Sequence, residues 1–394
     1  MASRDRPGPE APVITSDAPG SFPRSVLAER HPALIRQVRD AFPYGPEQHA
    51  ALDALLASGE RGVIEPLGPG AHDHEQWRRW GREQFGRSWF EAPFLWAESY
   101  FYRRLLEAVG YFAPGPWQGV DPFRPFKQAE LRTAEAAEEL RAVDRLAKEP
   151  RSVQDRALLH GSLWGNRADL GFRITAGSGD EQDRPLVADD ARALWSLLPE
   201  GGRATVYLVA DNAGRELVPD LLLIDHLLRH ARAGQVVLHV KPYPYFVSDA
   251  ITADVVDCLR HLRAAEGAAA EVGERLWAAM TDGRLTVRAH PFSCAPLPYA
   301  DMPDDLRRDF ARATVTVLKG DLNYRRLVGD RRWAPTTSFA ERTAHFPGSV
   351  AALRTLKSDV VVGLDADTEA ALVAAHGQRW RTGGTHALIQ VRAG

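Results

Sequence analysis

The chain has 394 residues, a formal net charge of -3 and 44% hydrophobic residues, which are ordinary values for a folded globular protein. The near-neutral charge, without a sustained basic patch, argues against binding to nucleic acid or to an anionic membrane. No run of residues approaches the ~20 apolar positions that a membrane-spanning helix needs. The two cysteines, Cys258 and Cys294, exclude a zinc site of four thiolates and fit a reducing compartment, so we expect a cytoplasmic protein.

Three regions follow one another along the chain. Residues 1–20 are charged and proline-rich, which predicts a flexible N-terminus and no signal peptide. Residues 21–200 carry apolar side chains at helical spacing and predict a mainly helical lobe. From 201 to 394, strand-like runs alternate with helical stretches, which is typical of an α/β lobe with a doubly wound, mostly parallel sheet.

Within the α/β lobe the pattern predicts strands at 204–210, 235–240, 285–289, 313–318, 350–353, 360–364 and 385–391. Helices are expected at 214–231, 250–263, 267–281 and 302–312. In an open α/β sheet, ligands bind in the crevice outside the carboxyl ends of the parallel strands. Polar residues that directly follow these strands are therefore candidate site residues, and we expect the metal site in this lobe.

Oxygen-bearing side chains follow two of the predicted strands. Asp211 and Asn212 come directly after the strand at 204–210, Glu216 comes one turn later, and Asp249 follows the strand at 235–240. Carboxylate and amide oxygens are the ligands that magnesium and manganese prefer. Each residue also has a simpler interpretation, because Asp and Asn often cap helices and Glu216 would suit the first turn of one.

The strand at 313–318 ends in a dense polar cluster, whose candidate site residues are Lys319, Asp321, Asn323 and Arg325. Arg354 and Lys357 follow the strand at 350–353 and reach the same edge if the sheet closes as predicted. The alternative for each cluster is a charged, solvated loop that caps the sheet. The repetition of polar groups at several strand ends favours a site.

Three further candidates come from the helical lobe. Glu98 and Arg103 lie on an aromatic-rich helical stretch, where a buried charge requires a partner. Asn166 interrupts a helical pattern and either caps a helix or reaches the site. Familiar nucleotide motifs, Gly-x-Gly-x-x-Gly and Gly-x-x-x-x-Gly-Lys-[Ser/Thr], are absent after the strands, as is the Gly-x-Ser-x-Gly of serine hydrolases.

Four segments in order resemble the metal-dependent damage-control phosphatase family, also called the acidic-residue methyltransferase-like family. They are Asp211-Asn212-x-Gly-x-Glu216, Val247-Ser248-Asp249, Lys319-Gly-Asp-Leu-Asn-Tyr-Arg325 and Arg354-Thr-Leu-Lys357. Residues 89–104 and 162–170 also resemble that family, specifically the branch related to sugar-phosphate phosphatases. The resemblance runs from about Gly20 to the end of the chain.

The resemblance implies a role for each motif. Asp211, Asn212 and Asp249 match the metal ligands of the family, and the ion would be manganese, magnesium, cobalt or nickel. The positions that match its phosphate- and sugar-binding residues are Lys319, Asp321, Asn323, Arg325 and Lys357. A phosphomonoester carries about two negative charges near neutral pH, so a divalent cation and cationic side chains suit its hydrolysis.

We therefore expect a metal-dependent phosphatase acting on a small phosphorylated sugar or related metabolite, in which the ion polarises the phosphate and activates water. Asp211, Asp249 and Glu216 are the candidate catalytic residues. Two alternatives stay open: an S-adenosylmethionine-dependent protein-glutamate carboxyl methyltransferase and a non-catalytic ligand-binding protein. Water attack is favoured over an aspartyl-phosphate route because both aspartates are committed to the metal. The sequence predicts neither the individual substrate nor the oligomeric state.

Overall fold

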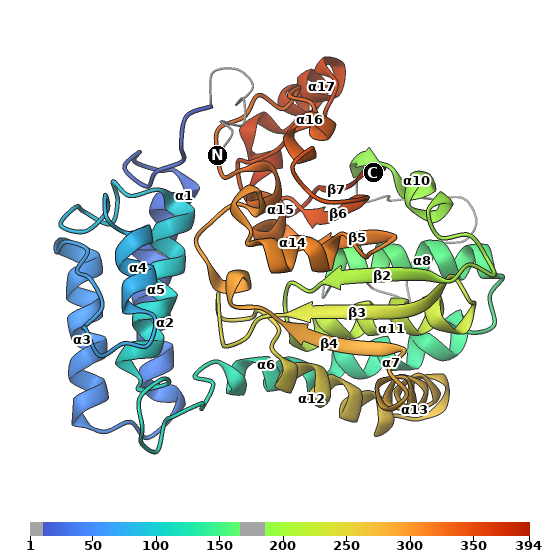
Figure 1. Cartoon of the computed structure of the whole chain (residues 1–394), viewed down its shortest axis with the longest axis horizontal. Helices are drawn as coiled ribbons and strands as arrows, with labels where there is room; N and C mark the ends of the chain where they lie inside the picture. The colour runs from blue at the N-terminus through green and yellow to red at the C-terminus, as the bar shows by residue number, and fades with distance from the viewer. Residues whose placement is uncertain (1–10, 166–185) are drawn as a thin grey trace.

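The computed structural model describes residues 11–165 and 186–394 and contains a seven-stranded sheet in the order β1-β7-β6-β5-β2-β3-β4 (Figure 1). Strands β2 to β6 run parallel, whereas β6 and β7 are antiparallel and β1 is parallel to β7. This confirms the predicted α/β fold with a mostly parallel sheet. The strands are β1 (Leu186–Asp189), β2 (Ala204–Val209), β3 (Ala233–Val240), β4 (Leu285–Ala289), β5 (Val315–Lys319), β6 (Val350–Thr355) and β7 (Ala387–Arg392).

The helices on one face of the sheet share a core with the strands. They include α7 (Ala134–Leu146), α8 (Arg151–Trp164), α11 (Leu217–Arg229), α12 (Thr252–Arg263) and α13 (Gly267–Thr281). The central strands are buried on both faces, which is why their sequences read as continuous apolar runs. The helices α7 and α8 fall within the predicted helical lobe, yet they pack under the sheet; the division at residue 200 stays a prediction.

The opposite face carries a second core, to which α14, α15 and α16 contribute. The elements here are α14 (Asp304–Phe310), α15 (Gly320–Val328), α16 (Phe339–Thr343) and α17 (Ala366–His376), with short turns η4 (Pro291–Cys294), η5 (Tyr299–Asp301) and η6 (Gly377–Arg381). The strand predicted at 360–364 is wrong. Val360 and Val362 are buried there, but side chains satisfy the backbone of Val362, because Tyr324 and Gln390 bond to it.

The N-terminal helices form a separate aromatic-rich bundle with its own core. It comprises α1 (Phe22–Ser25), the π-helical η1 (Val26–Arg30), α2 (His31–Ala41), α3 (Pro46–Arg61), α4 (His74–Trp80) and α5 (Phe94–Ala108). The helices α6 (Arg124–Leu131) and α10 (Ala191–Ser196) and the 3-10 turn η3 (Gly214–Glu216) complete the described elements. Figure 1 shows the carboxyl ends of β2, β3 and β4 directed toward this bundle. Tyr245 and Leu322, which follow β3 and β5, join the bundle core, so the strand ends lie against α5.

None of the helices in 11–165 and 186–394 has the length and apolar character required to cross a bilayer.

The buried histidine of α2 predicts a pH dependence of folding. His31 stacks on Phe101 at 3.6 Å between ring centroids, and burial lowers its pKa from 6.5 to about 3. The unfolded chain therefore binds a proton below pH 6.5 that the folded chain does not, so stability falls as the pH falls. At pH 5.5 the protonation of this histidine in the unfolded chain lowers the free energy of unfolding by roughly 1 kcal/mol relative to alkaline pH. We expect His31→Phe to remove that part of the loss, measured by urea unfolding at pH 7.5 and 5.5; an unchanged difference would contradict it.

Candidate active site

The turn after β2 and the turn before α12 are joined by backbone hydrogen bonds. The Ala213 amide donates to the Ser248 carbonyl at 2.6 Å, and the Ala250 amide donates to the Asp211 carbonyl at 2.9 Å. Asn212 and Asp249 form an isolated bridge between these hydrogen bonds. Because β2 and β3 are neighbours in the sheet, their polar ends meet at one edge, as the sequence pattern predicts.

Asp211 lies in a concentration of negative charge. Its side chain belongs to a residue only 7% exposed, and burial, Glu216 and Asp249 raise its carboxyl pKa well above the usual value. The Asn212 amide nitrogen Nδ2 donates to Asp211 Oδ2 at 3.3 Å and to Glu216 Oε2 at 2.9 Å. Asn212 Oδ1 accepts from the Ser248 hydroxyl at 2.7 Å. The amide thus links the two carboxylates and fixes them in one cluster.

Asp249 is 2% exposed and its carboxyl pKa is also raised, chiefly by burial. Lys241 Nζ lies 3.3 Å from Asp249 Oδ2, and this ion pair is the contact of that oxygen in the part of the chain that the structure describes. A second buried lysine, Lys127, donates to the Asp249 carbonyl at 3.0 Å and bonds to Asp121 and Asp254. The backbone of Asp249 is therefore fixed by α6, while one side-chain oxygen is available to a further partner.

The segment before Asp249 has a strained backbone. Phe246 and Val247 have positive φ values of 47° and 63°, and for a β-branched valine this conformation is a genuine outlier. Helix α5 holds the segment, because Phe246 stacks on Tyr102 at 4.8 Å and the Tyr245 hydroxyl donates to Ser99 Oγ at 2.6 Å. Strain of this kind persists where surrounding packing determines the conformation, and it is common at functional sites.

The donor set suits a divalent cation. Two buried carboxylates at raised pKa, of which Asp249 is paired with Lys241 alone through Oδ2 among the described residues, give negative charge that a cation would neutralise. Within the described residues no three His, Cys, Asp or Glu side chains gather into a metal cluster, so a third protein oxygen would come from Asn212. In this structure Asn212 turns its Nδ2 toward the carboxylates. To bind a cation, Asn212 would have to present Oδ1 there instead.

Helix α15 begins beside these carboxylates. Gly320 has φ of +83°, and a Cβ at this position would overlap the Asp211 carboxylate. Lys319, the last residue of β5, is buried and bonds to Asp220 Oδ1 at 2.6 Å and to the Ser162 carbonyl. Asn323 Nδ2 donates to the carbonyls of Ala210 and Lys319. Glycine at 320 thus allows the close approach, while Lys319 and Asn323 connect the strand ends.

Two arginine networks flank the cluster. Arg325 pairs with Asp330 at 2.7 Å and with Glu98 at 2.9 Å, so it joins α15 to α5, and burial raises the Glu98 pKa to about 7. Arg354 Nε donates to Asp321 Oδ1 at 2.8 Å, which also accepts from the Lys357 amide at 3.4 Å. These pairs hold the predicted substrate-binding residues next to one another.

Lys357 is the predicted cationic residue that acts electrostatically on Asp211. Its ammonium lowers the Asp211 pKa, against the larger raising effects of burial and neighbouring carboxylates. Lys319 has the same effect, although its ammonium is fixed by Asp220. The two lysines therefore bring positive charge to the edge of an acidic cluster, an arrangement suited to a bound anion next to a cation.

A further predicted site residue, Arg103, is bonded within the N-terminal part of the chain. Arg103 bonds to Asp73 at 2.6 and 2.8 Å and to Glu107 at 2.5 Å, and its guanidinium lies over Phe112. All these partners belong to the N-terminal part of the chain, so the contacts of Arg103 stabilise that part. Asn166 lies outside the described residues. The roles proposed for both residues stay predictions.

Sequence reasoning missed the partners Lys241, Lys127 and Asp220. Lys241 directly follows the apolar strand β3, and Asp220 is a lone carboxylate within the apolar helix α11; both positions signal a buried charge that needs a partner. Lys127 carries no such local signal, because its partners Asp121 and Asp254 are 6 and 127 residues away along the chain.

Comparison with known proteins identifies the family. A family model described as the damage-control phosphatase ARMT1-like domain matches residues 26–373. The Danio rerio protein named damage-control phosphatase ARMT1 is 30% identical over 428 residues, covering 94% of each chain. The Homo sapiens protein of that name is 31% identical over 339 residues, covering 76% of this chain and 75% of its own. A DUF89 family protein of solved structure from Pyrococcus horikoshii covers 84% of this chain and 92% of its own, with 15% identity and a TM-score of 0.46. The chain therefore belongs to the damage-control phosphatases with an ARMT1-like domain, which confirms the family and the phosphatase class of enzyme predicted from its motifs.

Proposed function

We propose that the protein uses a divalent cation at Asp211, Asn212 and Asp249 to hydrolyse a small phosphorylated sugar or related metabolite, with manganese as the first ion to test. The observation that carries the proposal is the meeting of two buried carboxylates, Asp211 and Asp249, at the ends of β2 and β3, where each raises the cost of charge on the other. The family membership supports a phosphatase that depends on metal. A cytoplasmic location is part of the proposal and is supported by the unpaired thiols of Cys258 and Cys294.

Several side chains of the protein would bind and orient the phosphorylated substrate. A bound divalent cation would supply Lewis-acid stabilisation of the phosphoryl oxygens. Lys357 would hold a phosphate oxygen, since its charge already acts on Asp211. Asp321 and Arg325, fixed by Arg354 and Asp330, would bind the sugar part through donors and acceptors at set positions. Lys319 and Asn323 would keep β5 and α15 in register with Asp211, and Glu98 would orient Arg325.

Glu216 is the group proposed to move the proton. Its Oε2 accepts from Asn212 Nδ2 at 2.9 Å, which keeps the carboxylate beside Asp211. If Asn212 turns its oxygen toward a cation, Glu216 Oε2 loses this donor and can accept a proton from the attacking water. Direct attack by water places solvent ¹⁸O in the released phosphate during a single turnover with enzyme in excess. Trapping of a phosphorylated aspartate would instead establish the covalent route.

The function is tested by measuring phosphate release from a chromogenic phosphomonoester after chelation and after return of manganese, magnesium, cobalt or nickel. The expected result is turnover that stops with chelator and returns with at least one ion. A parallel assay follows methyl transfer from S-adenosylmethionine to protein glutamate. Methyl transfer without phosphate release would establish the methyltransferase alternative. If the protein showed neither activity, the ligand-binding alternative would remain.

Removal of the Lys357 ammonium should weaken catalysis without unfolding the protein. We expect Lys357→Ala to lower kcat/KM by about 30- to 1,000-fold, roughly 2–4 kcal/mol, because a charge-assisted contact to the transition state is lost. Lys148→Ala, which removes an exposed lysine in the loop between α7 and α8, is the matched control and should leave the rate unchanged. Turnover by Lys357→Ala at the wild-type rate would show that this lysine does not bind the phosphate.

A further inference from the structure

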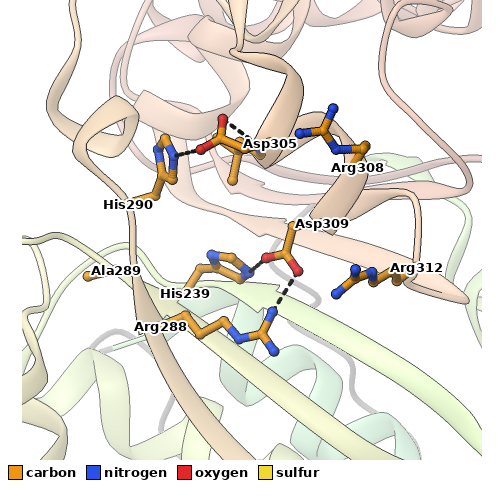
Figure 2. A pocket seen from close by; sticks show the side chains of 9 residues that line it. His239, Arg288, Ala289, His290, Asp305, Arg308, Asp309 and Arg312 are labelled. Atoms are coloured by element: carbon orange, nitrogen blue, oxygen red, sulfur yellow. Dashed lines mark hydrogen bonds and ion pairs between the residues drawn. The ribbon is translucent and has the colours of Figure 1, made fainter.

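A cavity of about 530 Å³ lies on the outer part of the sheet, between β3, β4 and α14 (Figure 2). None of its lining residues belongs to the proposed catalytic site. Its volume falls within the range of pockets that hold small ligands, about 300–1,000 Å³. His239 and Arg288 contribute side chains from the strands, whereas Arg308 and Arg312 come from α14 and the turn after it. Figure 2 shows the polar ends of these side chains around a common space.

The acidic groups of the cavity are already paired. Asp309 accepts from the Tyr207 hydroxyl at 3.1 Å and from Arg288 at 2.6 Å. Asp305 lies 3.3 Å from His290 Nε2, and the other ring nitrogen of that histidine accepts from the Phe292 amide, so Nε2 carries the proton donated to Asp305. Arg288 therefore compensates the charge of Asp309, whereas the neutral imidazole of His290 only donates a hydrogen bond to Asp305, which keeps its charge.

The remaining charge is positive. Arg308 and Arg312 are exposed, and within the part of the chain that the structure describes neither guanidinium has a carboxylate within ion-pair distance. They are four residues apart along the chain, one on α14 and one in the turn that follows it. An anion bound between them would reduce the repulsion between like charges. Guanidinium groups bind phosphate and carboxylate through two parallel hydrogen bonds.

A buried group points to an incomplete hydrogen-bond network at the same place. His239 is 3% exposed, and its Nε2 has no hydrogen-bond partner, since Asp309 Oδ2 is 3.7 Å away. Unsatisfied buried polar atoms are rare in folded proteins and require an explanation. Asp309 lies opposite this nitrogen and also accepts from Arg288, so a ligand that engages Arg288 would free Asp309 to approach His239.

We propose that this cavity is a second ligand site, distinct from the catalytic aspartates, which binds a small dianion of the phosphate or phosphate-monoester kind. Arg308 and Arg312 bind the anion from the helix side, and Arg288 closes the site from the sheet. The proposal does not depend on the catalytic function, because it concerns binding in the absence of metal and turnover.

The test is calorimetric titration of the full chain with inorganic phosphate at low ionic strength, with chelator present. We expect one saturable site in the wild type, weakened about tenfold or more in Arg308→Ala/Arg312→Ala because two charge-assisted contacts are lost. Both arginines are exposed, so the double variant should keep its melting temperature. The matched control, Arg36→Ala/Arg192→Ala, removes two exposed arginines elsewhere and should bind as the wild type does.

A third variant separates the two sites. Lys357→Ala should bind phosphate as the wild type does if the titration reports the cavity at α14. Loss of binding in Lys357→Ala, with retention in Arg308→Ala/Arg312→Ala, would assign the phosphate to the catalytic site and overturn the proposal. The absence of any saturable binding in the wild type would also overturn it.

Discussion

Replacement of Asp211 by asparagine should lower kcat/KM for phosphomonoester hydrolysis by at least about 10³-fold, roughly 4 kcal/mol, and at the same time raise the melting temperature of the metal-free protein. The loss of activity follows because a neutral amide holds a divalent cation less tightly than a carboxylate. The gain in stability follows because burial, Glu216 and Asp249 raise the Asp211 pKa, so the ionised carboxylate opposes folding. Because folding raises the Asp211 pKa, the free energy of unfolding decreases as the pH rises above 3.8, the ordinary value for this carboxyl. Asp211→Asn should remove this decrease.

Differential scanning calorimetry with chelator, together with phosphate release with manganese, measures both effects. Asp225→Asn is the matched control, because Asp225 is a buried carboxylate whose charge is compensated by Arg275 at 2.7 Å. Asp225→Asn should lower the melting temperature and leave phosphate release unchanged, whereas Asp211→Asn should raise the melting temperature and lower phosphate release. An active Asp211→Asn variant would remove Asp211 from the site. A lower melting temperature without metal would show that the carboxylate cluster is not strained.

Replacement of Gly320 by alanine should abolish most of the activity through backbone geometry alone. An added Cβ would overlap the Asp211 carboxylate, and the φ of +83° is unfavourable for alanine by about 1–2 kcal/mol. Asp211 must then leave its position beside Asn212 and Asp249. We expect a loss of activity comparable to that of Asp211→Asn, and weaker manganese binding in calorimetric titration.

Gly283→Ala separates the effect of the backbone conformation from the effect of the collision with Asp211. Gly283 has a φ of +80°, and a Cβ there would meet no atom within 4 Å, so the substitution carries the backbone penalty without the collision. It should lower stability by a similar amount and leave activity and manganese binding unchanged. If both variants behaved alike, the close approach of α15 to Asp211 would have no functional role.

The meeting of Asp211 with Asp249 could be predicted from the sequence because parallel strands share one carboxyl edge. Two apolar runs followed by polar residues are enough for that inference. The partners of the other candidates could not be predicted in this way. Lys319 bonds to Asp220 on α11, and Arg325 bonds to Glu98 on α5, so each contact joins elements far apart along the chain.

The local sequence pattern also gave a wrong prediction where side chains, rather than a neighbouring strand, bond to the backbone. Residues 360–364 have the apolar composition of a strand, but Tyr324 and Gln390 bond to Val362 and occupy its hydrogen-bonding groups. Strand β1 was not predicted, because Leu186–Asp189 is only four residues long and pairs with β7, about 200 residues later in the chain. Its existence depends on the completed sheet rather than on its own composition.

Anomalous diffraction from crystals soaked in manganese shows whether Asp211 and Asp249 hold a divalent cation. We expect an anomalous peak bound by carboxylate oxygens of both aspartates, with the Asn212 amide turned to present Oδ1. A peak bound elsewhere, or no peak in crystals of protein whose phosphate release requires manganese, would contradict it.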